Sequence, residues 1–495
     1  MPTRLAAAVA VAAALASALL AQPAPNAPGG LRFVVSLDPK LGGPVAGRVL
    51  VAVGPKDGTP DFTDYKPPVL PVLGTDATLA PSRPATLDAN ADVFPLSPLN
   101  DLPAGEYTVQ AILANNPDIN LPNAPGNRYC DPVRVKLDPA AGTTVSLSLD
   151  KAFAAKAPKD TATVRFLSLP SKLLSDSHGR PMTYRVGVVL PVGFDKEPAK
   201  TYGLILDVGG FGSRYTAARN LPPDPRFVQV VPDGAGPFGD PYQVNSANNG
   251  PYGDALVTEV IPYLEKAFRC GGPGKRFACG ASTGGWVSLA LQVYYPDVFN
   301  GCWSQCPDSL TFERFELIDI YADRNAFVNR FGFERPSTRT LDGDVISTVR
   351  HEAQLDRVLG KGGRWELGGR DWSSWNAVYG PRGADGLPVP LWDGRTGEIN
   401  KAAVEHWKRY DLTKYVAANW KALGPKLAGG KVNVWVGDAD DYFLNAAVHR
   451  FKEQVGKLRE PAFDGRVLIE LRKNHTSGGW TRKEQLDAMA ARGGL

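Results

Sequence analysis

One short segment of the chain has the residue types and spacing of a nucleophile on a tight turn. Ser282 lies in the run Gly280-Ala281-Ser282-Thr283-Gly284, after a stretch of β-type residues and before a stretch with helical spacing. A serine that exposes its hydroxyl at such a turn needs neighbours without a Cβ two positions away on either side, and Gly280 and Gly284 meet that need. A glycine-rich turn with an ordinary hydroxyl is the alternative. The strand-to-helix context favours a nucleophile.

A serine hydroxyl becomes nucleophilic when an adjacent base takes its proton, and that base needs a carboxylate to orient it. The chain has five histidines, and we predict His475 as the base because it directly follows the last strand-like segment. His449 lies in a helical stretch, where an exposed surface histidine is the default. The acid is expected where the preceding strand ends. Asp440 is the first choice, followed by Asp441 and Asp438.

Negative charge that develops on a carbonyl oxygen needs hydrogen-bond donors. The main-chain N–H of Thr283 is one expected donor, because it lies at the N-terminus of the predicted helix. The loop 209–212, Gly-Gly-Phe-Gly, is expected to supply another donor. A phosphate-binding loop is the alternative, but the Lys-Ser/Thr pair of such a loop does not follow these glycines.

The aspartates at 438–441 lack the regular spacing of a calcium loop. We therefore expect no metal and no organic cofactor.

The elements that must position these residues alternate in type after about residue 160. Apolar and β-branched runs predict strands, whereas residues 252–268 have helical spacing. The expected strands include 183–191, 202–210, 226–234, 298–308, 431–440 and 466–474. Such alternation predicts an α/β domain over 160–495, with a mostly parallel sheet covered by helices on both faces.

A long segment interrupts this alternation. We predict that residues from about 310 to 428 form a cap over the carboxyl edge of the sheet, because the segment is too long for an ordinary loop. Six of the ten tryptophans lie in this region. A tryptophan more often anchors a local core than lines a sugar or aryl pocket. The candidates for a pocket are Trp372 and Trp375, together with Trp480 near the C-terminus.

The first 150 residues have a different character. Residues 1–21 combine Arg4 with an apolar run and small residues, which predicts a secretory signal peptide followed by a linker over 22–30. A retained membrane anchor is the alternative. Residues 31–150 contain short β-type runs split by Pro, Gly, Asn and Asp, and predict a small Ig-like β-sandwich. We therefore expect a secreted or periplasmic protein.

Composition excludes some classes of function. The net charge is +4 over 495 residues and no Lys/Arg block occurs, so nothing indicates binding to nucleic acid. No later segment is apolar enough to span a membrane after signal cleavage. The five cysteines permit two disulfides and leave one thiol over, and the connectivity does not follow from the sequence.

Four segments, "GPYGDALVTEVIPYLEKAFRC", "GASTGG", "GDADDYFLN" and "NHTSGGW", resemble a known family. They are similar to the putative esterase family, which is the esterase D, feruloyl esterase and enterochelin esterase group of the α/β-hydrolase superfamily. The resemblance covers roughly 160–310 and 430–482. It implies the α/β-hydrolase fold and a catalytic triad at Ser282, Asp440 and His475. It also implies oxyanion donors at Gly210 or Phe211 and at Thr283.

The resemblance has two departures. Val208 stands where the group usually has histidine, and the Trp-rich insertion is unlike the compact members, so substrate identity is not carried over. We predict a serine esterase that forms an acyl-enzyme, with a small-molecule or carbohydrate ester as substrate and an acyl or feruloyl group as the acyl part. The alternatives are a serine peptidase on the same fold and a non-catalytic binding scaffold.

Overall fold

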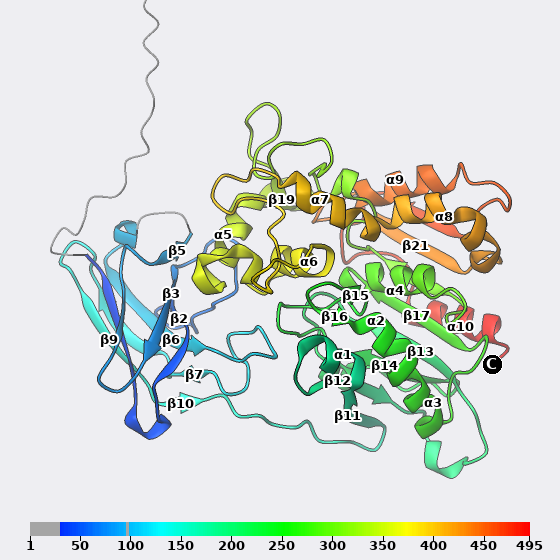
Figure 1. Ribbon diagram of the computed structural model, residues 1–495, viewed down its shortest axis with the longest axis horizontal. Helices are drawn as coiled ribbons and strands as arrows, with labels where there is room; N and C mark the ends of the chain where they lie inside the picture. Colours follow the sequence, from blue (N-terminus) through cyan, green and yellow to red (C-terminus); the bar gives the residue numbers. More distant parts are fainter. Residues whose placement is uncertain (1–29, 96–98) are drawn as a thin grey trace, which may run out of the picture.

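The computed structural model describes residues 30–95 and 99–495, so the predicted signal peptide and residues 22–29 of the predicted linker lie outside it. Strands come first in the chain and form one body, and alternating strands and helices form a second body beside it (Figure 1). An extended connector over residues 153–163 joins the two bodies.

The first body is a sandwich of two sheets. The smaller sheet contains β4 (Ala85–Leu87), β1 (Arg32–Leu37) and β9 (Thr144–Leu149). The larger sheet has the order β10 (Lys151–Ala152), β7 (Arg128–Tyr129), β6 (Gly105–Ala114), β2 (Val45–Pro55), β3 (Val72–Leu79) and β5 (Asp92–Phe94), with β8 (Val133–Leu137) paired to β6. Apolar side chains from both sheets, such as Phe33 and Val109, form one buried core between them.

Strand β2 is apolar at consecutive positions because both of its faces are buried. Successive side chains of a strand point to opposite faces. Val49 and Val51 point into the sandwich core, whereas Leu50 and Ala52 pack against helix α5 (Val349–Leu359) of the second body. The outer face of the sandwich is therefore closed by a helix that lies some 300 residues later in the chain.

The second body contains an eight-stranded sheet. Its order is β11 (Val164–Ser171), β12 (Met182–Val189), β14 (Phe227–Pro232), β13 (Gly203–Val208), β17 (Arg276–Ala281), β18 (Cys302–Gln305), β21 (Val432–Gly437) and β22 (Arg466–Glu470). Strand β12 is antiparallel to both of its neighbours, and the strands from β14 to β22 are parallel. The edge strand β11 was not predicted from the sequence, because it contains Pro170 and is only partly buried.

Helices cover both faces of this sheet. One face packs against α2 (Tyr252–Ala255), the π-helical turn η5 (Leu256–Val260), α3 (Ile261–Phe268), α4 (Thr283–Tyr294), α8 (Leu412–Leu427) and α9 (Asn445–Val455). The other face packs against α10 (Arg482–Gly493). Within β13, Leu204 and Leu206 face the first group of helices, and Ile205 faces α10. Short elements α1 (Lys172–His178), β15 (Asn245–Ser246) and β16 (Gly250–Pro251) complete this body.

The chain between β18 and β21 forms the predicted insertion. It contains β19 (Pro336–Arg339), β20 (Val345–Thr348), α5, α6 (Asp371–Tyr379) and α7 (Lys401–Trp407), and then returns to the sheet through α8. Helices α5 and α6 lie between the sandwich and the sheet (Figure 1). The expected fold class is confirmed: an α/β-hydrolase with a mostly parallel, doubly covered sheet and a large insertion, preceded by a small β-sandwich.

The five cysteines are free and buried, so the disulfides that their number permits do not form in this structure. Among the helices of the two described ranges, none has both the length and the apolar character needed to cross a bilayer. In the same ranges, no group of three or more His, Cys, Asp or Glu side chains is placed to hold a metal ion.

Candidate active site

Ser282 occupies a strained turn between β17 and α4. Its φ of 59° and ψ of −124° lie in a region that residues with a Cβ adopt only at a cost in free energy. Main-chain hydrogen bonds hold this conformation: the N–H of Ser282 donates to the carbonyl of Gln305 at 3.0 Å, and the carbonyl of Ser282 accepts from the N–H of Trp286 at 3.1 Å. The turn directs the serine side chain into a cavity rather than into the helix.

The glycines around Ser282 are required by the neighbouring strand β13. A Cβ added to Gly284 would lie 1.9 Å from the carbonyl oxygen of Val208, and one added to Gly280 would lie 2.3 Å from the same atom. On the other side, a Cβ on Gly285 would lie 2.3 Å from the carbonyl oxygen of Gln305. The turn that carries Ser282, called the elbow below, is therefore held between the ends of β13 and β18. At its three glycines there is room for a hydrogen atom but not for a side chain.

His475 and Asp440 are in direct contact. His475 lies in the loop after β22, and its Nδ1 is 2.8 Å from Oδ2 of Asp440. The Asp440 side chain is fully buried, and its second oxygen accepts main-chain hydrogen bonds from Tyr442 at 2.9 Å and Leu444 at 3.3 Å. These bonds fix the carboxylate, so it orients the imidazole and directs Nε2 away from Asp440.

The structure distinguishes Asp440 from the two other aspartates considered for the same role. Asp438 accepts the N–H of Arg472 at 2.6 Å and so holds the loop that follows β22. Asp441 is half-buried and has a pKa raised by burial and by the neighbouring Asp440. His449 is exposed on α9. Of the three aspartates, Asp440 is the one whose carboxylate is hydrogen-bonded to an imidazole.

The pKa of His475 reflects its charged neighbours. Burial on its own would lower that pKa, because it disfavours the imidazolium. The Asp440 carboxylate, with a contribution from the Cys306 side chain, outweighs burial and raises the pKa above its ordinary value. The ring of Tyr442 lies edge-on to the imidazole, with 4.9 Å between the two ring centroids. The contact with Asp440 thus stabilises the imidazolium, the form that His475 takes when it accepts a proton.

Ser282 and His475 line the same cavity, whose volume is about 380 Å³. Its other lining residues are Gly210, Phe211, Ser213, Asp308, Asp371, Trp375, Tyr442 and Leu444. Within the described residues no hydrogen bond joins Ser282 to His475; instead, Oγ of Ser282 lies 3.5 Å from Oδ1 of Asp308. In this structure the serine hydroxyl is therefore directed toward Asp308.

Asp308 is the functional candidate that sequence reasoning missed. Its Oδ2 accepts hydrogen bonds from the hydroxyl of Tyr242 at 2.5 Å, the indole N–H of Trp375 at 3.1 Å and the hydroxyl of Thr283 at 3.2 Å. The residue is 3% exposed, and burial raises its pKa to about 6 despite these hydrogen bonds. A carboxyl group with a raised pKa thus lies beside Ser282.

A signal for Asp308 was present in the sequence. Asp308 follows the last residue of β18 by three positions, as Asp440 follows the last residue of β21 by three. Both residues therefore lie at the carboxyl edge of the sheet, where ligands bind in open α/β folds. For Tyr242, which lies in an irregular loop, we find no comparable sequence signal.

The predicted oxyanion donors also lie beside Ser282. A Cβ added to Gly210 would be 3.9 Å from the Cβ of Ser282, so this loop runs next to the nucleophile candidate. Within the described part of the chain, the main-chain N–H groups of Phe211 and Thr283 make no hydrogen bond. The following N–H, from Gly212, is bonded to Asp240 at 3.1 Å and holds the loop in place. Two unpaired donors are thus available next to the serine.

Comparison with known proteins identifies the family. Residues 184–457, more than half of the 495-residue chain, match the family described as Putative esterase. The chain belongs to the Putative esterase family. It is therefore a carboxylic ester hydrolase. No match was found among curated proteins.

Solved structures match this esterase at low identity. A ferulic acid esterase is 15% identical with a TM-score of 0.38, over 66% of this chain and 96% of that chain. An S-formylglutathione hydrolase from Agrobacterium tumefaciens is 14% identical with a TM-score of 0.35, over 68% and 98%. The fluorophosphonate-binding serine hydrolase FphF from Staphylococcus aureus is 14% identical with a TM-score of 0.36, over 67% and 98%. The family assignment rests on the sequence match alone.

The tryptophans of the esterase mostly build the core of the insertion. Trp375 is in the wall of the cavity with Ser282, but the structure differs from the prediction at Trp372 and Trp480, which are outside that wall. Trp372 is 1% exposed and donates its indole N–H to Glu352 at 2.9 Å. Trp480 packs beside α10. Large aromatic side chains gain most from burial, so packing accounts for Trp372 and Trp480.

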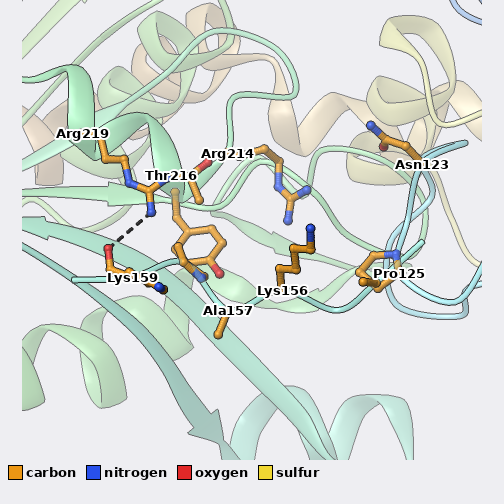
Figure 2. Close-up of a pocket in the computed structure, with 11 residues that line it drawn as sticks. Asn123, Pro125, Lys156, Ala157, Lys159, Arg214, Thr216 and Arg219 are labelled. Atoms are coloured by element: carbon orange, nitrogen blue, oxygen red, sulfur yellow. Dashed lines mark hydrogen bonds between the residues drawn. The ribbon is translucent and has the colours of Figure 1, made fainter. Parts of the chain in front are cut away.

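A second cavity of the esterase, of about 480 Å³, lies where the connector passes the loop after β13 (Figure 2). Its wall is basic, with Lys156 and Lys159 from the connector and Arg214 and Arg219 from the α/β body. Arg214 is already paired with Asp233 at 2.5 Å. None of the predicted catalytic residues lines this cavity, so the cavity around Ser282 is the candidate active site.

Proposed function

We propose that this esterase hydrolyses carboxylic esters through a triad of Ser282, His475 and Asp440. The observation that carries the proposal is the hydrogen bond between His475 and the buried Asp440, in the cavity that also contains the strained Ser282. A binding scaffold has no need for an oriented imidazole beside a serine held at positive φ. Such strain persists in folded proteins mainly where function requires it.

In the proposed reaction, Oγ of Ser282 attacks the ester carbonyl carbon while Nε2 of His475 takes its proton. The negative charge moves to the carbonyl oxygen, which the N–H groups of Phe211 and Thr283 stabilise. The tetrahedral intermediate collapses, His475 protonates the departing alcohol, and the acyl group remains on Ser282. Water, deprotonated by His475, then attacks the acyl-enzyme and releases the carboxylic acid. Asp440 stabilises the imidazolium in both halves of the reaction.

We further propose an acyl or feruloyl ester of a carbohydrate as the substrate, and export of the protein from the cytoplasm. The apolar and aromatic wall of the cavity, with Phe211, Trp375 and Leu444, supports an aryl or short acyl group. The composition of residues 1–21 supports export.

The triad is tested with a fluorophosphonate probe and with p-nitrophenyl acyl esters. Wild type should be labelled, and Ser282→Ala should not. Ser282→Ala, His475→Ala and Asp440→Asn should each lower kcat/KM by roughly 10³-fold or more, because the three residues act as one unit. Circular dichroism and thermal unfolding check that each variant is folded.

Two variants serve as matched controls. Asp438→Asn changes a carboxylate in the same loop and keeps an oxygen that accepts the Arg472 N–H, and His449→Ala removes an exposed imidazole. Both should retain activity within about threefold of wild type. Labelling that persists in Ser282→Ala would contradict the proposed nucleophile. Faster cleavage of peptide amides than of aryl esters would contradict the proposed substrate class and favour a peptidase.

A further inference from the structure

We propose that the β-sandwich completes the substrate cleft: its loop 61–66 binds the alcohol part of the ester, an uncharged oligosaccharide, beyond the scissile bond. This inference rests on the proposed function, because it assigns the outer part of the same site. It gives the sandwich a role in specificity that its own core packing does not require.

A cavity of about 400 Å³ has a wall that comes from both bodies. Five of its lining residues, Asp61, Thr63, Asp64, Tyr65 and Lys66, belong to the loop between β2 and β3 of the sandwich. The remaining four, Phe211, Arg370, Asp371 and Tyr442, come from the α/β body.

This outer cavity is continuous with the cavity that contains Ser282. Phe211, Asp371 and Tyr442 line both of them. Tyr442 follows Asp440 by two residues, and Phe211 carries a proposed oxyanion donor, so the shared wall is part of the catalytic machinery itself. A substrate whose carbonyl lies at Ser282 and that extends past these three residues reaches the loop of the sandwich.

The loop 61–66 has an ordered shape of its own. Oδ1 of Asp61 accepts the N–H groups of Thr63 at 2.7 Å and Asp64 at 3.2 Å, and Oδ1 of Asp64 accepts the N–H of Lys66 at 3.0 Å. Aspartates that bond to the main chain two residues ahead fix turns in this way. The loop therefore presents Thr63, Asp64 and Lys66 without a large entropic cost when a ligand binds.

Contacts with the insertion hold the loop against the α/β body. The side chains of Phe62 and Tyr65 are buried in the apolar cluster that includes α5. Nε2 of His351 lies 3.1 Å from the carbonyl oxygen of Tyr65, and the guanidinium of Arg370 lies over the Tyr65 ring at 5.5 Å. Two bodies joined in this way keep the outer cavity formed in the absence of substrate.

The chemistry of the outer cavity suits a neutral ligand with many hydroxyl groups. Phe211 and Tyr442 offer ring surface for the apolar face of a sugar, and Thr63 with the charged side chains offers donors and acceptors for hydroxyls. The outer cavity contains three carboxyl groups, from Asp61, Asp64 and Asp371, against two cationic side chains, Lys66 and Arg370. A carboxylate-bearing sugar would meet net repulsion.

The experiment compares two acetyl esters on the full chain: p-nitrophenyl acetate, which fits within the inner cavity, and acetylated xylotriose. The double variant Thr63→Ala/Lys66→Ala removes polar groups from the outer wall and leaves the buried anchors in place. We expect kcat/KM for acetylated xylotriose to fall about tenfold, as for the loss of one or two hydrogen bonds, with p-nitrophenyl acetate unchanged within about twofold. Calorimetry should show that free xylotriose binds wild type and binds the variant more weakly.

Lys56→Ala is the matched control, because Lys56 precedes the same loop, pairs with Glu106 and lines neither cavity. This variant should leave kcat/KM for both esters unchanged. The inference is wrong if the double variant lowers the turnover of both esters equally, or if it lowers the turnover of neither ester. It is also wrong if a trimer of galacturonic acid binds as tightly as xylotriose. If wild type shows no Ser282-dependent ester hydrolysis, the proposed function fails; p-nitrophenyl turnover without xylotriose binding overturns this inference alone.

Discussion

At the scale of single residues, two buried carboxyl groups near Ser282 have different surroundings. Asp440 contacts an imidazole and accepts two main-chain hydrogen bonds, so its negative charge is compensated. Asp308 accepts hydrogen bonds from neutral groups only, and its pKa is raised to about 6 because burial disfavours the charge. Asp440 is therefore suited to orient a base, whereas Asp308 makes the charge beside Ser282 depend on pH.

This difference predicts how stability depends on pH at Asp308. The folded-state pKa is above the unfolded value, so the folded protein binds the proton more tightly between pH 4 and about 6. The free energy of unfolding should therefore fall as pH rises through that window, by at most about 3 kcal/mol for a shift of about two pKa units, and should stay constant above it. Asp308→Asn carries no such charge and should lack this slope.

The measurement is urea-induced unfolding of wild type and Asp308→Asn at pH 4, 5, 6 and 7. The difference in unfolding free energy between the two proteins should change in favour of the variant as the pH rises. Two pH profiles that run parallel would show that the pKa of Asp308 is not raised in the folded protein.

At the scale of elements, the site depends on how closely the elbow approaches β13. Alanine ordinarily stabilises a helix relative to glycine, by up to about 1 kcal/mol. Gly284 in the first turn of α4 should behave in the opposite way, because its Cβ would lie 1.9 Å from the carbonyl oxygen of Val208. Main-chain atoms of a central strand cannot move aside locally, so the helix and the strand must separate.

Gly284→Ala should therefore destabilise the protein by about 2 kcal/mol or more and lower esterase activity by displacing Ser282. Denaturant unfolding and p-nitrophenyl ester hydrolysis measure the two effects. Gly105→Ala in β6 is the control, since its added methyl meets only side-chain atoms of Tyr107, the nearest at 3.4 Å. A Gly284→Ala protein as stable and as active as wild type would mean that the elbow is less tightly packed than described.

At the scale of the whole molecule, the two bodies are joined by a buried polar contact. Arg48 of β2 is 4% exposed, donates to the carbonyl of Val358 at 2.9 Å and pairs with Asp92 at 2.6 Å. Arg357 of α5 pairs with the same aspartate at 3.0 Å. Next to this contact, a Cβ on Gly74 would lie 2.2 Å from the carbonyl oxygen of Val358, so β3 and α5 touch along the main chain.

Removing Arg48 should loosen the joint between the bodies. Arg48→Ala leaves the Val358 carbonyl unpaired and Asp92 with one cation fewer, which should cost about 3 kcal/mol of unfolding free energy. Cleavage of the connector over 153–163 by a low dose of protease should become faster. Arg134→Ala removes an exposed ion pair with Asp57 in the same sandwich and should cost less than about 1 kcal/mol. Equal effects of the two variants would contradict a buried joint.

Local patterns in the sequence determined the fold class, the alternation of strands and helices, and the family. These features follow from local patterns because the spacing of apolar side chains and the choice of turn residues depend on a few neighbouring positions. The strand, turn and helix around Ser282 are an example. The contact between His475 and Asp440 was also expected, because consecutive parallel strands end at the same edge of a sheet. Their catalytic roles, and that of Ser282, stay predictions that the proposed variants test.

Only the tertiary structure decided what surrounds Ser282. The partners of Asp308 are spread between residues 242 and 375, and the loop 61–66 meets Tyr442 from the far end of the chain. The tryptophans of the insertion look alike in sequence, yet Trp375 faces the cavity and Trp372 the core. A contact between distant segments produces no repeating pattern in the sequence of either segment. Whether two such segments touch depends on the shape and charge of surfaces that form only when the chain folds.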